Sequence, residues 1–263
     1  MKQAIYTKST ILAQKLRNFS LRVFHKLENN QNASSSENGE SFLIDSLCQD
    51  WLAKTLKRPT LLDVGANQGA YASMCLNAAE KRGLELNLHL FEPGMDSFET
   101  LSQKFATDQV QLNHFGLSSK AEKRTIYFDR KGSTLASLYQ RDLSNEGLTL
   151  DQKEEIQLKK LSQYIREREI DHIHFLKLDV EGHEYDSLLG MEEFLRPDFV
   201  DFIQFEYGGA NIDALVPLRK LYALFESKGF AVGKLKPNGI ERRTYQAFME
   251  NYAYANYIAF SGS

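Results

Sequence analysis

The first half of the chain alternates short apolar runs with longer amphipathic segments. The apolar runs at 60–64, 86–91 and 110–115 are short enough to be buried strands, and residues 70–82 and 95–106 have helical periodicity. A repeat of strand, helix and strand predicts a parallel, doubly wound sheet with helices on both faces. Ligands of such sheets bind at the carboxyl ends of the strands, so the loops that follow the strands are the first candidates for a functional site.

The second half continues this pattern less regularly. Residues 129–155 are mostly polar, which favours an inserted lid, and residues 236–243 contain Pro, Gly and Arg and are expected to form a loop. Further strands are expected at 124–128, 173–180, 200–205, 230–235 and 255–260, and further helices at 41–57, 161–169, 183–195 and 214–228.

The composition is that of one globular chain of average size. Its 263 residues carry a formal net charge of −3 and 42% hydrophobic residues, so neither wholesale disorder nor whole-chain attraction to nucleic acid is expected. Two cysteines, Cys48 and Cys75, are too few for a disulfide framework or a cysteine zinc site, which favours a reducing, cytoplasmic location. Neither a membrane-spanning helix nor a signal peptide is expected.

Residues 1–28 are expected to form an N-terminal helical arm. Its apolar residues recur at helical spacing (Leu12, Leu16, Phe19, Val23 and Leu27), and its basic residues (Lys8, Lys15, Arg17, Arg22 and Lys26) share the segment with no acid before Glu28. Such a helix packs on its own domain or a neighbouring subunit, lies on an anionic membrane surface, or is a transit peptide, and these readings stay open. The polar residues 29–40 read as a linker, so the arm and linker (1–40) precede a domain of residues 41–263.

A glycine loop follows the first strand. The sequence Asp63-Val64-Gly65-Ala66-Asn67-Gln68-Gly69 carries two glycines, and Glu92 ends the second strand. Glycines let a backbone approach a ligand, and an acid at the end of the second strand can accept hydrogen bonds from both ribose hydroxyls. The G-x-x-x-G spacing lacks the third glycine of a dinucleotide site, and Asp63 suits a cationic ligand better than a pyrophosphate. The pattern therefore favours S-adenosylmethionine, which has sulfonium and ammonium groups, as the cofactor.

A second acidic loop follows the strand at 173–180. It contains Asp179 and His183, and Glu206 ends the next strand at the same edge of the sheet. These residues are candidates for a catalytic base that takes a proton from an alcohol, with His183 having the intrinsic pKa for this task. The same three side chains could instead bind a divalent metal, an alternative that we do not favour. Glu181 and Glu184 in this loop could simply stabilise the start of the following helix.

These motifs resemble those of the FkbM-type methyltransferase family over residues 60–260. The resemblance rests on the glycine loop, on Phe91-Glu92-Pro93, on Leu176-Lys177-Leu178-Asp179-Val180-Glu181-Gly182-His183-Glu184 and on Phe205-Glu206. It implies a Rossmann-like, class I methyltransferase sheet of seven strands with the last strand antiparallel. The family's Leu-Asp pair before the fourth strand is Leu161-Ser162 here. The cofactor-binding residues that the loop and the resemblance together indicate are Asp63, Gly65, Asn67, Gly69, Glu92, Asn113, Gly116 and Leu117.

The resemblance implies methyl transfer from S-adenosylmethionine to a hydroxyl of a sugar, a glycan or another small natural product. The polar lid is then expected to cover the acceptor, and basic residues could meet an anionic acceptor (Arg130, Lys131, Arg141, Arg242 and Arg243). Two other readings use the same sequence: a nicotinamide-dependent oxidoreductase, and a non-catalytic protein that docks partners or a membrane through residues 1–28. No nucleic-acid partner is expected.

Overall fold

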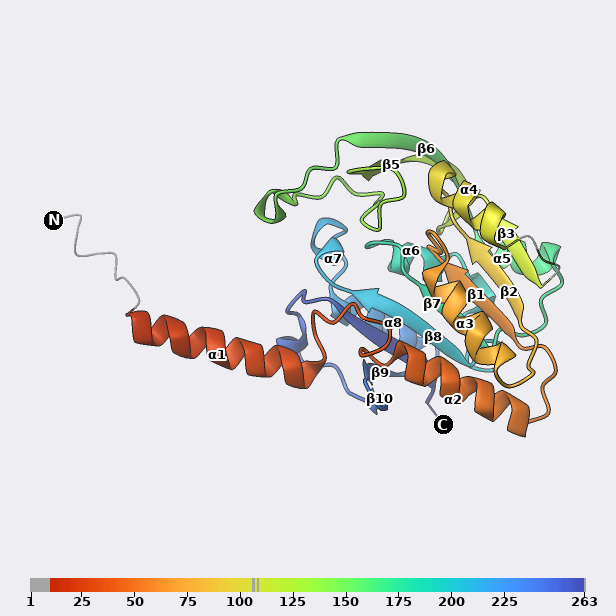
Figure 1. Ribbon diagram of the computed structural model, residues 1–263, viewed down its shortest axis with the longest axis horizontal. Coiled ribbons are helices and arrows are strands. Elements are labelled where there is room, and N and C mark those ends of the chain that lie inside the picture. The colour runs from red at the N-terminus through yellow and green to blue at the C-terminus, as the bar shows by residue number, and fades with distance from the viewer. Residues whose placement is uncertain (1–9, 106, 108, 263) are drawn as a thin grey trace.

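The computed structural model describes residues 10–105, 107 and 109–262 of the chain. Figure 1 shows a layered body, a small sheet above it and one long helix that projects from its side. The part of the predicted arm that lies in residues 1–9, with Lys8, falls outside the described residues.

The central sheet has eight strands within the described residues, in the order β10-β9-β11-β8-β7-β1-β2-β3. Strands β1, β2, β3, β7 and β8 are parallel neighbours, and β11 runs antiparallel between β8 and β9. The bounds are β1 Thr60–Val64, β2 Asn87–Phe91, β3 Val110–Asn113, β7 Phe175–Leu178, β8 Phe202–Tyr207, β9 Phe230–Lys236, β10 Gly239–Arg242 and β11 Ala255–Ser261. The predicted Rossmann-like fold and antiparallel last strand are therefore confirmed.

The predicted number of strands is wrong, because the sheet has an eighth strand. Residues 236–243 were expected to be a loop, but β10 pairs antiparallel with β9 as a hairpin. Gly239 has a φ of +138°, which a residue with a side chain rarely adopts, so this glycine permits the tight turn. The hairpin adds β10 at the edge of the sheet, at the opposite end of the strand order from β3.

Helices cover both faces of the sheet. On one face α2 (Glu40–Ala53), α3 (Ala70–Glu80) and α4 (Met95–Lys104) share a core with the strands, and on the other face α5, α6 and α8 share a second core. The second group has the bounds α5 Leu161–Glu167, α6 Glu184–Leu189 and α8 Leu218–Ser227. Two buried cores on opposite faces are what a doubly wound sheet requires.

The helix predicted at 183–195 is shorter than its sequence pattern. It divides into α6 and a short 3₁₀ turn, η3 (Glu192–Phe194), and the helix predicted at 214–228 begins only after Pro217. The strand predicted at 173–180 ends at Leu178, because the backbone turns through Glu181 and Gly182, whose φ values are +49° and +99°. A further short helix, α7 (Ala210–Asp213), follows β8.

The predicted lid contains part of a second, three-stranded sheet. Its strands are β4 (Gly116–Leu117), β5 (Glu122–Phe128) and β6 (Gln152–Lys159), in the order β4-β6-β5. A short 3₁₀ turn, η2 (Ser144–Glu146), lies in the loop between β5 and β6. Ile126, Leu138, Ile156 and Leu158 form a small buried core beneath this sheet. Figure 1 shows the small sheet above the ends of the central strands.

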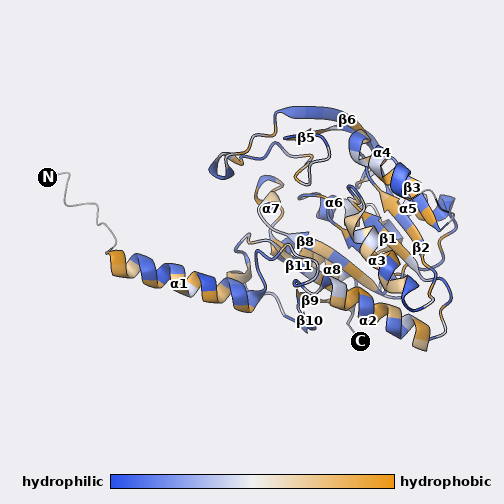
Figure 2. Cartoon of the chain, viewed as in Figure 1, coloured by the Kyte–Doolittle hydropathy of each residue, from blue (hydrophilic) through white to orange (hydrophobic). Residues whose placement is uncertain are grey.

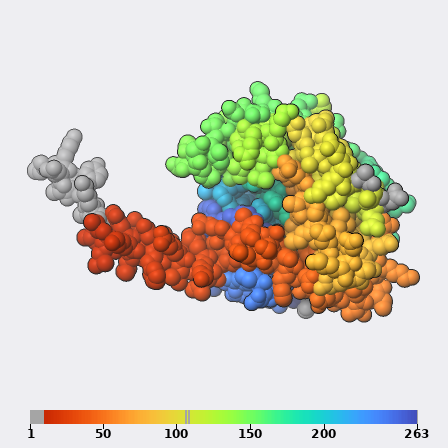
Figure 3. Space-filling model, viewed as in Figure 1, coloured from red at the N-terminus to blue at the C-terminus, as the bar shows by residue number. Residues whose placement is uncertain are grey.

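The N-terminal helix α1 (Ile11–Glu28) has no buried residue. In Figure 3 it projects from the body, which it contacts, within the described residues, only near its C-terminal end, where the Phe24 ring packs against the Phe248 ring. The segment 29–40 that follows is closely bonded to the central sheet, since the Asn29 side-chain amide donates to the Leu235 carbonyl oxygen at 3.1 Å and the Gln31 N–H donates to the Tyr254 carbonyl oxygen at 2.8 Å. No helix of the described ranges is both long enough and apolar enough to cross a membrane.

Candidate active site

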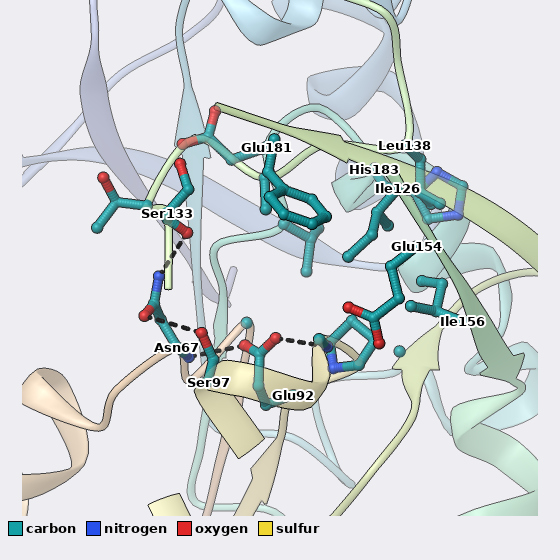
Figure 4. A pocket seen from close by; sticks show the side chains of 18 of the residues that line it. Asn67, Glu92, Ser97, Ile126, Ser133, Leu138, Glu154, Ile156, Glu181 and His183 are labelled. Carbon is teal, nitrogen blue, oxygen red and sulfur yellow. Dashed lines mark hydrogen bonds between the residues drawn. The ribbon is translucent and has the colours of Figure 1, made fainter. Parts of the chain in front are cut away.

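A pocket of about 990 Å³, counted with its open mouth, lies between the central sheet and the small sheet. Its floor comes from the loops after β1, β2 and β7, and its roof comes from β5, β6 and the loop between them. We call it the first pocket. Figure 4 shows polar side chains, among them Asn67 and Ser133, on one side of it, and the apolar Ile126 and Ile156 with Glu154 and His183 beside them on the other. The pocket therefore offers one wall for an apolar ring and one for hydroxyl groups.

Glu92 is fixed at the floor of the first pocket. Its carboxylate accepts hydrogen bonds from the backbone N–H of Asn67 at 2.9 Å and of Gly94 at 2.8 Å, as drawn in Figure 4. Its own N–H donates to the carbonyl oxygen of Asn113 at 3.1 Å. Burial raises the pKa of Glu92 to about 7, against the two backbone hydrogen bonds that lower it. Glu92 is thus a rigid acceptor whose charge changes near neutral pH.

The two glycines of the loop after β1 serve backbone packing. Gly65 has a φ of +83°, and a Cβ there would overlap the carbonyl oxygen of Asp179 at the end of β7. Gly69 has a φ of +74°, and a Cβ there would overlap the Phe105 ring. Gly65 also lines the first pocket, whereas Gly69 does not. Close contact between the loops after β1 and β7 therefore depends on glycine at position 65.

Lys177 is a buried cation at the junction of β1 and β7. Its ammonium donates to the carboxylate of Asp179 at 2.6 Å and lies 3.9 Å from that of Asp63. Burial alone would lower the pKa of Lys177, but the attraction of Asp179 and Asp63 outweighs it and raises the pKa. Asp63 is fully buried without a hydrogen bond to its carboxylate among the described residues, and burial raises its pKa to about 6.

Asp179, Glu181 and Glu206 bring carboxylate oxygens within 4.8 Å of one another at the ends of β7 and β8. We call these three residues the carboxylate cluster. Burial raises the pKa of Glu181 to about 8, with a further contribution from the Asp179 charge. Burial and Asp179 also raise the pKa of Glu206 well above its usual value. The raised pKa values of Glu181 and Glu206 allow these two carboxyl groups to exchange protons with a ligand.

A second pocket of about 780 Å³ lies on the other side of the carboxylate cluster. Glu206, Tyr254 and Arg141 line it, and Glu181 lines both pockets. The Tyr254 hydroxyl donates to Glu206 at 2.8 Å, and Arg141 donates to Glu181 at 2.6 Å from the lid. The Arg141 Nε has no hydrogen-bond partner within the described part of the chain and lies 3.8 Å from Asp213. The two pockets therefore meet at Glu181.

His183 lies apart from the carboxylate cluster. Its ring is buried, with Nδ1 3.0 Å from the Tyr139 hydroxyl and Nε2 3.0 Å from the Ser118 hydroxyl. Burial lowers its pKa. Both ring nitrogens thus connect the loop after β7 to the lid and to the segment after β4, and the side chain forms part of the wall of the first pocket.

The structure brings together most of the residues predicted to form the site. Those that line the first pocket are Gly65, Asn67, Glu92, Gly116, Leu117, Asp179 and His183, and Glu206 lines the second. Asp63, Gly69 and Asn113 lie behind the walls, where Asn113 donates to the Leu90 carbonyl oxygen at 3.1 Å. The metal alternative grouped Asp179, His183 and Glu206, but within the described residues Glu181 stands where His183 was expected.

Sequence reasoning missed Tyr254 and the pairing of Arg141 with Glu181, and it left open whether Glu181 serves the ligand or the start of the following helix. Glu184 is the residue that accepts from the backbone there, from the N–H groups of Val180 and Gly182 at 3.2 Å each. The only sequence signal for Arg141 was its place among the basic residues of the polar lid. Its pairing with Glu181 joins positions 40 residues apart, which no local pattern specifies.

Relatives of the chain are methyltransferases by name. It is 24% identical over 194 residues to "Methyltransferase 1" of Beauveria bassiana, covering 68% of this chain and 74% of the relative. It is 31% identical over 140 residues to the hexuronic acid methyltransferase AglP of Haloferax volcanii, covering 52% of this chain and 51% of the relative. Among solved structures, the CurJ carbon methyltransferase aligns with a TM-score of 0.46 at 9% identity, covering 88% of this chain and 56% of that one.

The methyltransferase FkbM domain matches residues 63–232 of the chain. That range includes the glycine loop, Glu92 and the whole carboxylate cluster, so the match spans every residue that lines the first pocket and part of the second, whose Gln31 and Tyr254 lie outside it. The chain belongs to the FkbM methyltransferase family.

Proposed function

We propose that the protein is an S-adenosylmethionine-dependent O-methyltransferase that acts on a hydroxyl of a sugar or glycan. The observation that carries this proposal is the meeting of two pockets at Glu181, within a cluster of three carboxylates. A group-transfer enzyme needs a donor site and an acceptor site that share one reacting edge.

The residues of the first pocket fit S-adenosylmethionine. Glu92 offers a carboxylate to the two ribose hydroxyls, and the apolar Leu117, Ile126 and Leu158 offer a surface for the adenine ring. Asp179 places a carboxylate at the opposite end, which suits a cationic sulfonium and ammonium. When bound, this cofactor supplies an electrophilic methyl group. The predicted binding role of Asp63 becomes an indirect one in this proposal, because Asp63 acts on the pocket through Lys177 and Asp179.

The second pocket is the proposed acceptor site. The alcohol must lose its proton as the new bond forms, and the carboxylate cluster is the proposed acceptor of that proton. Lys177 holds Asp179 in place, and Tyr254 holds Glu206 in place, so the acceptor hydroxyl meets a preorganised group of oxygens. His183 supports the lid in this proposal, since both of its ring nitrogens have hydroxyl partners.

The proposed acceptor class rests on the chemistry of the second pocket and on one relative. Carboxylates and a tyrosine hydroxyl suit the many hydroxyl groups of a sugar, and Arg141 adds one cation that can contact an anionic substituent. The relative named for hexuronic acid supports a sugar acceptor. We place the reaction in the cytoplasm, because Cys48 and Cys75 are both free and buried.

The proposal is tested with purified full-length chain, S-adenosylmethionine and a panel of neutral sugars, uronic acids and short glycans, read by mass spectrometry. We expect one acceptor class to gain a single methyl group that survives mild alkaline hydrolysis, as an ether does. Asp179→Asn and Glu206→Gln should bind S-adenosylhomocysteine but turn over at least about 100-fold more slowly, the usual scale for loss of a proton acceptor. Binding of NAD(H) in place of S-adenosylhomocysteine would favour the oxidoreductase reading instead.

A further inference from the structure

Helix α1 carries an apolar stripe that no other part of the described chain covers. Leu12, Leu16, Phe19, Val23 and Leu27 recur at a spacing of three or four residues, which places them along one side of the helix. Their side chains are between 42% and 73% exposed. Figure 2 shows orange and blue residues alternating along α1, as expected for an amphipathic helix.

Positive charge borders this stripe. At 100° per residue, Lys15, Arg22 and Lys26 lie beside the stripe on one flank, and Arg17 lies beyond its other flank. Glu28 is the first acid of the chain, at the last position of the helix. The exposed surface of α1 therefore combines an apolar line with a border of four cations.

The far end of α1 is fixed to the body of the protein. The Lys236 ammonium donates to the Leu27 carbonyl oxygen at 2.5 Å, and the Glu28 carboxylate pairs with Arg243 and lies 3.3 Å from the buried Lys234 ammonium. Glu28 and the residues after it hold the helix at the edge of the sheet beside β9. The last turn of the helix is thus bonded directly to the body.

We propose that α1 docks the protein onto an anionic lipid surface. The stripe would enter the boundary between headgroups and acyl chains, and Lys15, Arg22 and Lys26 would extend to lipid phosphates. A second copy of this chain is the other obvious partner for the stripe. Charge repulsion argues against this partner. Pairing two such helices would bring together four cations from each, and residues 11–27 contain no acid that could neutralise them. An anionic membrane satisfies the apolar and the charged features together.

The C-terminal end of α1 lies near the second pocket. Gln31, three residues beyond the helix, lines that pocket with Tyr254, and its N–H donates to the Tyr254 carbonyl oxygen at 2.8 Å. Docking through α1 would hold this pocket close to the lipid surface. The docking itself does not depend on the reaction proposed above, and the test below needs no turnover.

The experiment is sedimentation of the full-length chain with phosphatidylcholine vesicles, with and without added phosphatidylglycerol. We expect binding to anionic vesicles that weakens as salt rises. Leu16→Glu with Phe19→Glu should abolish it, and Lys15→Gln with Arg22→Gln should weaken it by about tenfold or more. Leu21→Glu is the matched control, because Leu21 is 48% exposed on the opposite side of α1 and should retain binding within about twofold of the unchanged chain.

Equal binding by all four proteins, or no binding by the unchanged chain, would overturn the proposal. A third result would also overturn it: the unchanged chain is a dimer in light scattering and binds no vesicles, and the Leu16→Glu, Phe19→Glu variant is a monomer. In that case a second copy of the chain would cover the stripe. Thermal unfolding of each variant separates these outcomes from misfolding. Because α1 has no buried residue, all variants should unfold at the same temperature as the unchanged chain.

Discussion

Glu92 combines a buried carboxylate with a pKa of about 7, so its ability to accept hydrogen bonds changes across neutral pH. Above pH 7 it is ionised and can accept from two ribose hydroxyls, whereas below pH 7 it is protonated and loses acceptor strength. We therefore predict that the Kd of S-adenosylhomocysteine rises about tenfold between pH 8 and pH 6. Calorimetry at several pH values measures this change.

Glu92→Gln should bind S-adenosylhomocysteine more weakly at pH 8 and should lose this pH dependence, because the amide does not titrate. Glu85→Gln, at an exposed carboxylate remote from both pockets, should retain the profile of the unchanged chain. A flat profile in the unchanged chain would contradict the assigned role of Glu92.

Gly65 is constrained twice, by its φ of +83° and by the Asp179 carbonyl oxygen that a Cβ would overlap. We predict that Gly65→Ala lowers the free energy of unfolding by about 3 kcal/mol or more, since left-handed backbone strain adds to a backbone clash. Gly83→Ala is the matched control, because Gly83 has a φ of +65° and open space around it, so only about 1 kcal/mol should be lost. Urea unfolding measures both, and equal losses would show that the contact with Asp179 is not what requires glycine.

Single residues also mark the limit of what the sequence predicts. Glu92 and Asp179 follow strands directly, so the alternation of strands and helices placed them at one edge of the sheet. The partners that set their environment come from distant positions, such as Arg141 in the lid beside Glu181. Asn113 was expected near the ligand, yet its side chain holds the end of β2, because its amide reaches the Leu90 carbonyl oxygen.

At the scale of elements, the strands buried on both faces were predictable, whereas of the more exposed strands β5 was predicted and β6 and β10 were not. Strand β1 buries four residues in five, and three of them are apolar, so only Asp63 interrupts its apolar run. Strand β6, Gln152–Lys159, buries only Ile156 and Leu158, and its other residues are polar. Its sequence therefore did not predict a strand. Strand β10 has no buried residue and was missed for the same reason.

The small sheet is held over the first pocket by a few polar contacts, of which Tyr139 with His183 is one. Tyr139→Phe removes that hydrogen bond and keeps the ring. One net hydrogen bond is worth about 1 kcal/mol, so we predict that the Kd of S-adenosylhomocysteine rises by about fivefold. Calorimetry measures the change, and a fall in affinity should accompany faster hydrogen exchange in residues 129–150.

Tyr127→Phe is the control for this prediction. Tyr127 lies on β5 of the same sheet, and it does not line the first pocket. This variant should bind S-adenosylhomocysteine as the unchanged chain does. If both variants bind equally well, the Tyr139 contact does not contribute to closure of the first pocket.

At the scale of the whole molecule, the segment 29–40 is built into the body and α1 is not. Asn30 and Asn38 are buried, and Asn30 accepts from the Lys234 ammonium at 2.5 Å. Asn38 donates to Glu40, which accepts in turn from Gln204 at 2.6 Å in the middle of the sheet. Polar composition suggested a linker here, because burial of asparagine by long-range hydrogen bonds leaves no apolar signal in the sequence.

This difference predicts unequal effects of two truncations. Removing residues 1–27 takes away a part of α1 that has no buried residue, so the melting temperature should stay within about 2 °C of that of the unchanged chain. Removing residues 1–39 deletes both Glu28 and Asn30, the oxygen partners of Lys234, which is 1% exposed. An unpartnered buried ammonium is costly, so the melting temperature should fall by about 10 °C, measured by calorimetry.

Adding Lys234→Met to the chain without residues 1–39 should recover part of that loss, because no buried charge then remains at that position. Equal melting temperatures for the two truncated chains would show that segment 29–40 contributes nothing to the stability of the sheet.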